Sequence, residues 1–188
     1  MFAERGYHAT TIAALLDATG LSAGALYHYV SGRDELLVLI CDELLDPLLE
    51  RARAILAADV PAETALRELL HAWLEHIERH LDHMRVFQQE RHVIEHDPRW
   101  HEIRAKRLAF EEMLDAVLAR AEASGAMAFG DRRLALLGMV NYTPTWFRPG
   151  GRLRAGEIAD GYCDLLINAY QPSDRTFRCQ PRARSPQS

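Results

Sequence analysis

The stretch that decides the fold runs from Thr10 to Leu37 and reads TTIAALLDATGLSAGALYHYVSGRDELL. Its first part predicts a short helix over residues 11–18, because a capping threonine precedes apolar residues at helical spacing. Gly20 predicts the end of this helix, since glycine adopts the left-handed conformation at no steric cost. Ser22 then predicts the cap of a second helix that reaches Val30. Two short helices joined by a tight turn are typical of a helix-turn-helix.

The second helix opens with the small residues Ala23, Gly24 and Ala25, which leave its first turn slim enough to enter a groove. Leu26 and Val30 are expected to anchor its back. From spacing alone, DNA binding and an ordinary helical hairpin are about equally favoured, because loose matches to short motifs are frequent.

The wider string, GYHATTIAALLDATGLSAGALYHYVSGRDELL over residues 6–37, resembles the DNA-binding segment of the TetR family of transcriptional repressors. That segment runs Gly-Tyr, two threonines, Gly-Leu-Ser, Leu-Tyr-x-Tyr and a basic-acidic pair, and nearly every position is filled between Phe2 and Leu37. Val30 stands where the family usually has phenylalanine, and Arg33 where it usually has lysine. The resemblance implies an all-α regulator that binds operator DNA through this motif.

The same resemblance implies the DNA contacts. We expect hydroxyls, polar tips and one cation to position the motif on phosphates, while the two small residues approach base edges. These residues are Thr11, Ser22, Tyr27, His28 and Arg33 for the phosphates, and Ala23 and Gly24 for the bases.

Members of the family carry a complete first helix before this segment, and here only Met1 to Arg5 precedes Gly6. We therefore expect an N-terminally incomplete DNA-binding domain over residues 1–37. Residues 1–40 hold two arginines against four acidic residues, and the whole chain has a net charge of −5. The cluster of basic residues expected of a DNA-binding domain is therefore missing. Either the cations lie in an absent segment, which we favour, or binding relies on the helix dipole, hydroxyls and Arg33.

The rest of the chain predicts helices only, because apolar residues recur at helical spacing and no strand alternation competes. We expect an all-α fold of about nine helices, with a ligand-binding and dimerisation domain over residues 38–171 and a disordered tail over 172–188. Pro47 is expected to bend the first long helix. The expected helices beyond the motif span residues 34–56, 61–81, 82–95, 98–123, 131–147 and 157–170.

Composition excludes several classes of protein. No apolar run approaches the roughly 20 residues of a membrane span and no signal peptide is visible, which predicts a soluble, cytoplasmic chain without a membrane partner. Cys41, Cys163 and Cys179 are odd in number and far apart, as expected of a reducing compartment. No phosphate loop, nucleophile elbow or paired-carboxylate spacing stands out, so we expect neither an enzyme nor a cofactor.

Two histidine pairs, His76 with His80 and His92 with His96, have the four-residue spacing that lets two imidazoles reach one metal. Neither pair has a clear third ligand in the sequence, and nine histidines make chance pairs frequent. We therefore expect no metal site.

A second resemblance lies in the C-terminal half, where residues 141–153 read NYTPTWFRPGGRL. Residues 138–170 look like the ligand domain of TetR regulators that respond to acyl-CoA thioesters of fatty-acid or steroid breakdown. An acyl-CoA needs an apolar slot and cations for its phosphates. For each candidate, core packing or a solvated face competes with ligand contact. The residues expected to bind the ligand are Trp73, Phe87, Arg91, Arg107, Tyr142, Trp146 and Arg148, with Trp146 capping the pocket.

These expectations together describe a homodimeric repressor that a small apolar ligand releases from DNA. The two last helices are expected to pair with their copies, because both carry more apolar surface than one core can cover. The alternative is a ligand-binding or dimerisation module that does not bind an operator, because its first helix is absent.

Overall fold

The computed structural model describes residues 1–96, 98–124 and 132–168, and in this part of the chain every regular element is a helix. The all-α prediction is therefore confirmed. None of the described helices is long and apolar enough to span a bilayer.

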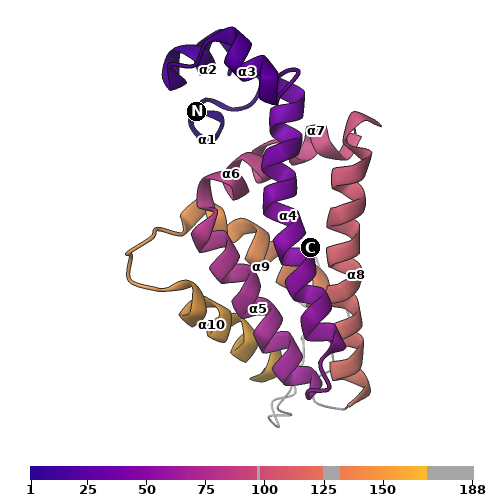
Figure 1. Ribbon diagram of the computed structural model, residues 1–188. Coiled ribbons are helices and arrows are strands. Elements are labelled where there is room, and N and C mark those ends of the chain that lie inside the picture. The colour runs from indigo at the N-terminus through magenta and orange to yellow at the C-terminus, as the bar shows by residue number, and fades with distance from the viewer. Residues whose placement is uncertain (97, 125–131, 169–188) are drawn as a thin grey trace, which may run out of the picture.

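The described helices form a small N-terminal group and a larger bundle, joined by one long helix (Figure 1). The group lies at one end of the molecule, and α4 runs from it along the bundle. The N-terminal group comprises α1 (Phe2–Arg5), α2 (Ile12–Thr19) and α3 (Ala23–Tyr29), followed by α4 (Arg33–Ala57). The bundle adds α5 (Ala62–Arg79), α6 (Leu81–Gln89), α7 (Arg91–His96), a 3-10 turn (Pro98–Trp100), α8 (His101–Ala123), α9 (Arg132–Trp146) and α10 (Ala155–Asn168).

Helix α4 organises the bundle through one buried apolar stripe. It packs against α5, α6 and α8, which surround it on successive sides. Fully burying a leucine contributes roughly 1.5–3 kcal/mol, so a stripe of this length fixes the rotation of the helix about its own axis. The buried members of the stripe are Leu37, Cys41, Leu44, Leu45, Leu48, Leu49, Ala52 and Ile55.

Helix α5 lies between α4 and α10 and is the second centre of packing. Its Trp73 meets Phe110 of α8 edge-on, with ring centroids 4.7 Å apart. On its other side Arg67 and His71 reach Asp160 of α10 at 2.9 and 2.8 Å. Gly156 of α10 lies beside the same histidine, because a Cβ placed there would be in ordinary van der Waals contact with the His71 ring, 3.5 Å away.

The helix expected over residues 82–95 is instead two helices, and this is a correction. Helix α6 ends at Gln89 and α7 begins at Arg91. Glu90 between them turns inward, is only 6% exposed, and accepts a hydrogen bond from the backbone N–H of Tyr7. A buried carboxylate needs such a donor, so the tertiary contact interrupts the helical pattern. Pro98 likewise opens a 3-10 turn, and α8 begins only at His101.

Other expected boundaries hold within a few residues, and some lie outside the described part of the chain. The cap expected at Asp131, the end of the last helix at Tyr170 and the tail over residues 172–188 all fall outside it. Among the described cysteines, Cys41 and Cys163 are buried free thiols. Burial raises the pKa of Cys41 to about 12 and that of Cys163 to about 11, so both are protonated core groups.

Helix α4 continues through Pro47, which is exposed. We expect this proline to lower the free energy of unfolding. Proline cannot donate the hydrogen bond that the Glu43 carbonyl would otherwise accept. Pro47→Ala should stabilise the protein by about 1–2 kcal/mol, after the entropy that proline removes from the unfolded chain is discounted. A shift of that size raises Tm by roughly 2–8 °C in calorimetry. Glu50→Ala, exposed on the same helix, is the control and should leave Tm nearly unchanged. An unchanged or lower Tm for Pro47→Ala would contradict the prediction.

Candidate functional site

The two short helices of the motif are held by side-chain caps and a glycine turn. The Thr11 hydroxyl accepts from the Ala14 N–H, and the Ser22 hydroxyl accepts from the Ala25 N–H, both at 3.1 Å. Gly20 ends α2 with φ of +69°, where its N–H donates to the Leu16 carbonyl at 2.9 Å. Such local interactions explain why the predicted bounds of this motif agree with the structure.

Helix α3 presents most of its surface to solvent. No residue within it is buried, and only Val30, just past its end, reaches the core. A Cβ placed at Gly24 would meet nothing within 4 Å, so the exposed edge of α3 is open at this position. The exposed residues of this edge include Ser22, Ala23, Gly24, Tyr27, His28 and Tyr29. All predicted DNA contacts on the second helix are therefore accessible.

Arg33 is placed differently from the other predicted DNA contacts. Its Nη1 donates to the carbonyl oxygens of Tyr7, His8 and Thr10 at 3.1–3.2 Å. Its guanidinium carbon lies 4.3 Å from the centre of the Tyr7 ring, as in a cation–π contact. The Tyr7 hydroxyl in turn donates to Asp34. Arg33 thus fastens the segment between α1 and α2 to the start of α4.

Glu90 makes a second link between the N-terminal helices and the bundle. Its carboxylate accepts the Tyr7 N–H at 3.0 Å and lies 3.8 Å from His8 Nε2. Sequence reasoning missed this residue, because a glutamate among arginines and glutamines is usually a solvated surface group. The contact joins residues 83 positions apart, so only the folded chain shows it.

An apolar cavity lies where α4, α5, α6, α8 and α9 meet, beside the start of α7. Its volume is about 40 Å³, well below the roughly 300–1,000 Å³ of a typical ligand pocket. Four predicted ligand residues, Trp73, Phe87, Arg91 and Arg107, line it together. The other lining residues are Leu44, Leu45, Leu48, Met84, Gln88, Phe110, Glu111, Leu137 and Asn141.

Arg107 gives the cavity a polar side. Its Nη1 and Nη2 pair with Glu111 at 2.5 Å and Glu95 at 2.9 Å. Its Nε is buried and has no hydrogen-bond partner. An unsatisfied buried donor costs about 1–3 kcal/mol, so a ligand oxygen that accepts this hydrogen bond would be favoured here.

Tyr142, Trp146 and Arg148 do not line this cavity. The side of α9 that reaches it carries Leu137 and Asn141. Tyr142 and Trp146 are instead 65% and 41% exposed. Arg148 lines a wide polar groove of about 790 Å³ with Arg79 and Arg85. Trp146 is therefore not a cap of the cavity in this structure.

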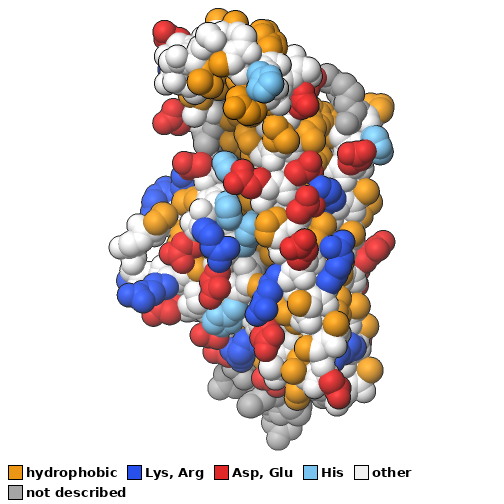
Figure 2. All heavy atoms as spheres, in the orientation of Figure 1, with side chains coloured by type: hydrophobic (Ala, Val, Ile, Leu, Met, Phe, Trp, Pro, Cys, Tyr) orange, Lys and Arg blue, Asp and Glu red, His pale blue; other side chains and the backbone are white. Residues whose placement is uncertain are grey.

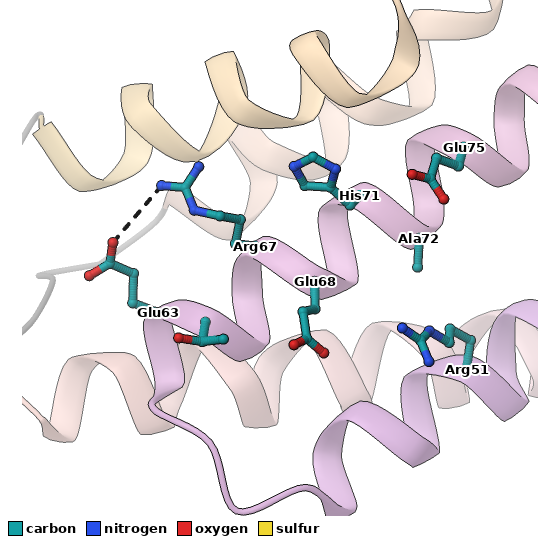
Figure 3. Close-up of a pocket in the computed structure, with 8 residues that line it drawn as sticks. Arg51, Glu63, Arg67, Glu68, His71, Ala72 and Glu75 are labelled. Atoms are coloured by element: carbon teal, nitrogen blue, oxygen red, sulfur yellow. Dashed lines mark ion pairs between the residues drawn. The ribbon is translucent and has the colours of Figure 1, made fainter.

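A further groove, of about 360 Å³, lies on α5 beside α4 and is polar (Figure 3). Figure 3 shows Arg67 and His71 directed from α5 toward α10, with Arg67 paired to Glu63. Hydrogen bonds from His71 and then Arg67 lower the pKa of Asp160 on α10. These charges serve the packing of α5 on α10, and the groove offers little to an apolar ligand.

Two family models match the chain. Residues 1–40 match the model of bacterial regulatory proteins of the tetR family. Residues 59–170 match the tetracyclin repressor-like C-terminal domain. The two matches cover the N-terminal helices and the bundle in turn.

Known proteins are similar over most of their length. The HTH-type transcriptional repressor KstR2 of Mycobacterium tuberculosis is 28% identical over 172 residues, which cover 89% of this chain and 86% of KstR2. The solved structure of that ketosteroid transcriptional regulator aligns with a TM-score of 0.80, at 26% identity, over 90% of this chain and 88% of that one.

The TetR family regulator PfmR of Thermus thermophilus aligns with a TM-score of 0.78 at 32% identity, over 89% of this chain and 92% of PfmR. AibR, solved with isovaleryl coenzyme A and operator DNA, shares the fold with a TM-score of 0.76 at 22% identity, over 88% of this chain and 91% of AibR. The family models, the relatives and the capped, exposed motif agree: this chain belongs to the tetR family of bacterial regulatory proteins and is a helix-turn-helix transcriptional repressor.

Proposed function

We propose that this repressor binds operator DNA as a homodimer and leaves it when a small apolar effector, an acyl-CoA thioester, enters the cavity between α4 and α8. One observation carries the proposal. Helix α4 follows directly on α3 and also forms a wall of the cavity through Leu44, Leu45 and Leu48. Any occupant that displaces this wall acts on the element that carries the DNA-binding helices.

On the DNA side, α3 is the recognition helix of the proposal, with Ala23 and Gly24 against base edges. The hydroxyls of Thr11 and Ser22 accept backbone hydrogen bonds as caps, and each O–H can still donate to a phosphate oxygen. Tyr27 and His28 add exposed polar tips. The proposed role of Arg33 is to position the DNA-binding helices, because its guanidinium is turned inward toward backbone carbonyl oxygens.

The lining of the cavity and the relatives support the proposed effector class. Leucine, methionine and aromatic side chains suit an apolar acyl group, and the buried Arg107 Nε suits a carbonyl or other acceptor. KstR2 is named a ketosteroid regulator, and AibR was solved with isovaleryl coenzyme A, so this fold can hold an acyl-CoA. Arg91 and Arg107 at the cavity, and Arg148 in the outer groove, are the proposed cations for the acceptor and phosphate groups.

The small volume of the cavity supports a mechanism of release in which the helices move. An acyl chain of several carbons needs more than the 40 Å³ present, so its binding must move the helices that form the walls. Two connections carry that movement to the DNA-binding helices: α4 itself, and Glu90 at the α6–α7 joint, which holds the Tyr7 N–H. The effector then favours the arrangement that fits DNA less well.

The dimer surface of the proposal is formed by α9 and α10. These helices carry Leu134, Tyr142, Trp146 and Leu165 with 41–65% of each residue exposed. Large exposed apolar side chains on these two helices favour an interaction surface there. Tyr142 and Trp146 are thus assigned to pairing with a second copy as well as remaining ligand candidates from the resemblance.

The first prediction of this proposal concerns Gly24. Gly24→Leu should weaken operator binding at least about 100-fold in a gel-shift assay, because the added side chain fills the space next to the bases and blocks several contacts. The free protein should keep its helical circular dichroism and Tm, since a Cβ at this site meets nothing. Ala119→Leu, exposed on α8, is the size-matched control and should bind like the parent chain. Normal binding by Gly24→Leu would disprove the groove assignment.

The second prediction concerns the dimer. Sedimentation of the parent chain at micromolar concentration should give the mass of two copies, and Leu165→Glu should give that of one, because it buries charge in the interface. Leu108→Glu, at a residue 48% exposed on α8, should remain dimeric. A monomeric parent chain would rule out the dimer.

The third prediction concerns the effector. Acyl-CoAs, their free acids and coenzyme A alone should be titrated against the protein–operator complex, and the thioesters should release DNA at the lowest concentrations. Arg107→Gln should raise the half-release concentration of thioester and acid alike by about tenfold, since it removes a hydrogen bond of roughly 1.5 kcal/mol to the acyl end. Arg148→Gln should affect the thioester alone, because only the thioester offers phosphates. Equal potency of acid and thioester would remove the coenzyme A part of the proposal.

A further inference from the structure

Three potential metal ligands meet where α4 passes the joint of α5 and α6. Glu43 lies on α4, His80 lies between α5 and α6, and His83 lies on α6. Their ligand atoms all lie within 4.8 Å of one another. Figure 2 shows histidine side chains gathered beside α4 on this face, with acidic side chains next to them. In the part of the chain that the structure describes, this is the one group of its kind.

One imidazole of this group, His83, keeps a buried nitrogen, Nδ1, without a hydrogen-bond partner. Buried polar atoms in native proteins are nearly always hydrogen-bonded, so this atom needs an explanation. A free lone pair on a neutral imidazole is what a transition metal binds. His76 packs on His80 with ring centroids 4.5 Å apart, and His80 stacks on His83 at 6.0 Å. The three rings therefore hold one another in position.

We propose that Glu43, His80 and His83 bind one divalent first-row transition metal ion, with zinc as the reference. Two imidazoles and one carboxylate are a common protein ligand set for such an ion, and water completes a tetrahedral site. Imidazole ligands disfavour calcium and magnesium, which prefer oxygen donors. Ligand atoms around zinc lie roughly 3.3 Å from one another. Side-chain rotations that move the ligand atoms by about 1–1.5 Å therefore close the site. His76 packs against the ring of His80 and so restricts the orientation of that ring.

The surroundings of the cluster allow an ion to arrive and give its binding a consequence. His80 and His83 line the open groove of about 790 Å³, so solvent reaches them. Arg85 in that groove is paired with Asp82 at 3.1 Å. Glu43 directly precedes Leu44 and His83 directly precedes Met84, both of which line the apolar cavity. A bound ion thus ties α4 to the α5–α6 joint next to the cavity.

The site is tested on the full chain without DNA or effector, so the result is independent of the proposed function. Protein freed of metal with a chelator and then desalted is titrated with zinc chloride in a calorimeter. We expect saturation at one ion per chain and a Tm that rises with zinc concentration. Cobalt chloride should give the visible absorption of a four-coordinate cobalt site, which zinc then abolishes.

The variants separate this cluster from ordinary surface histidines. Glu43→Gln, at an exposed residue, and His83→Ala should each weaken zinc binding at least about tenfold. His96→Ala is the control, because His92 and His96 are an exposed pair of neighbouring helical histidines outside the cluster, with rings 4.3 Å apart. It should bind zinc like the parent chain. If His83→Ala misfolds, Glu43→Gln and the cobalt spectrum decide. The proposal is overturned if no saturable one-to-one binding occurs, or if Glu43→Gln binds zinc as tightly as the parent chain.

Discussion

The structure depends on the burial of one apolar stripe along α4. The stripe packs against α5, α6 and α8 at the same time, so α4 cannot rotate or slide without exposing leucines on several sides. Since packed interiors respond to strain by shifting between discrete arrangements, a helix held in this way moves as a unit. The DNA-binding helices precede α4 in the chain, and three of its leucines line the cavity. One packing surface therefore serves the fold, the cavity and the connection to DNA.

Charged groups reinforce the joint at the start of α4. Arg33 donates hydrogen bonds to three carbonyl oxygens of the segment between α1 and α2, which otherwise has few regular hydrogen bonds. The buried Glu90 carboxylate accepts a hydrogen bond from the Tyr7 N–H of the same segment, which attaches that segment to the bundle. A buried carboxylate is stable only while its donors stay in place, so a shift at the α6–α7 joint disturbs Tyr7 as well. The neighbours of Glu90 in sequence, Gln88 and Arg91, line the cavity.

Sequence reasoning predicted what depends on neighbours along the chain and missed what depends on distant contacts. Thr11, Gly20 and Ser22 mark helix ends by local hydrogen bonds and a positive φ, and the structure has those ends where they were expected. The break at Glu90 could not be predicted, because the donor that causes it lies 83 residues away. Helix α9 is apolar on most sides, so its sequence does not indicate which side faces the cavity. The structure has Leu137 and Asn141 there, while Tyr142 and Trp146 lie exposed, and their role as ligand contacts stays a prediction. The grouping of Glu43 with His80 and His83 was equally hidden, since the helical spacing of the histidines says nothing of α4.

For the proposed mechanism, the small volume of the cavity determines which arrangement of the protein can hold an effector. A preformed pocket of full size would bind an effector in both arrangements of the protein, and equal binding shifts no equilibrium however tight it is. A cavity of about 40 Å³ excludes an acyl chain from the arrangement seen here. In the proposed mechanism the effector therefore binds almost only the opened arrangement, and its whole binding energy, less the energy needed to separate the helices, drives the shift. On this proposal, tight packing around Trp73 and Phe110 weakens effector binding but makes that binding selective for one state, which a switch requires.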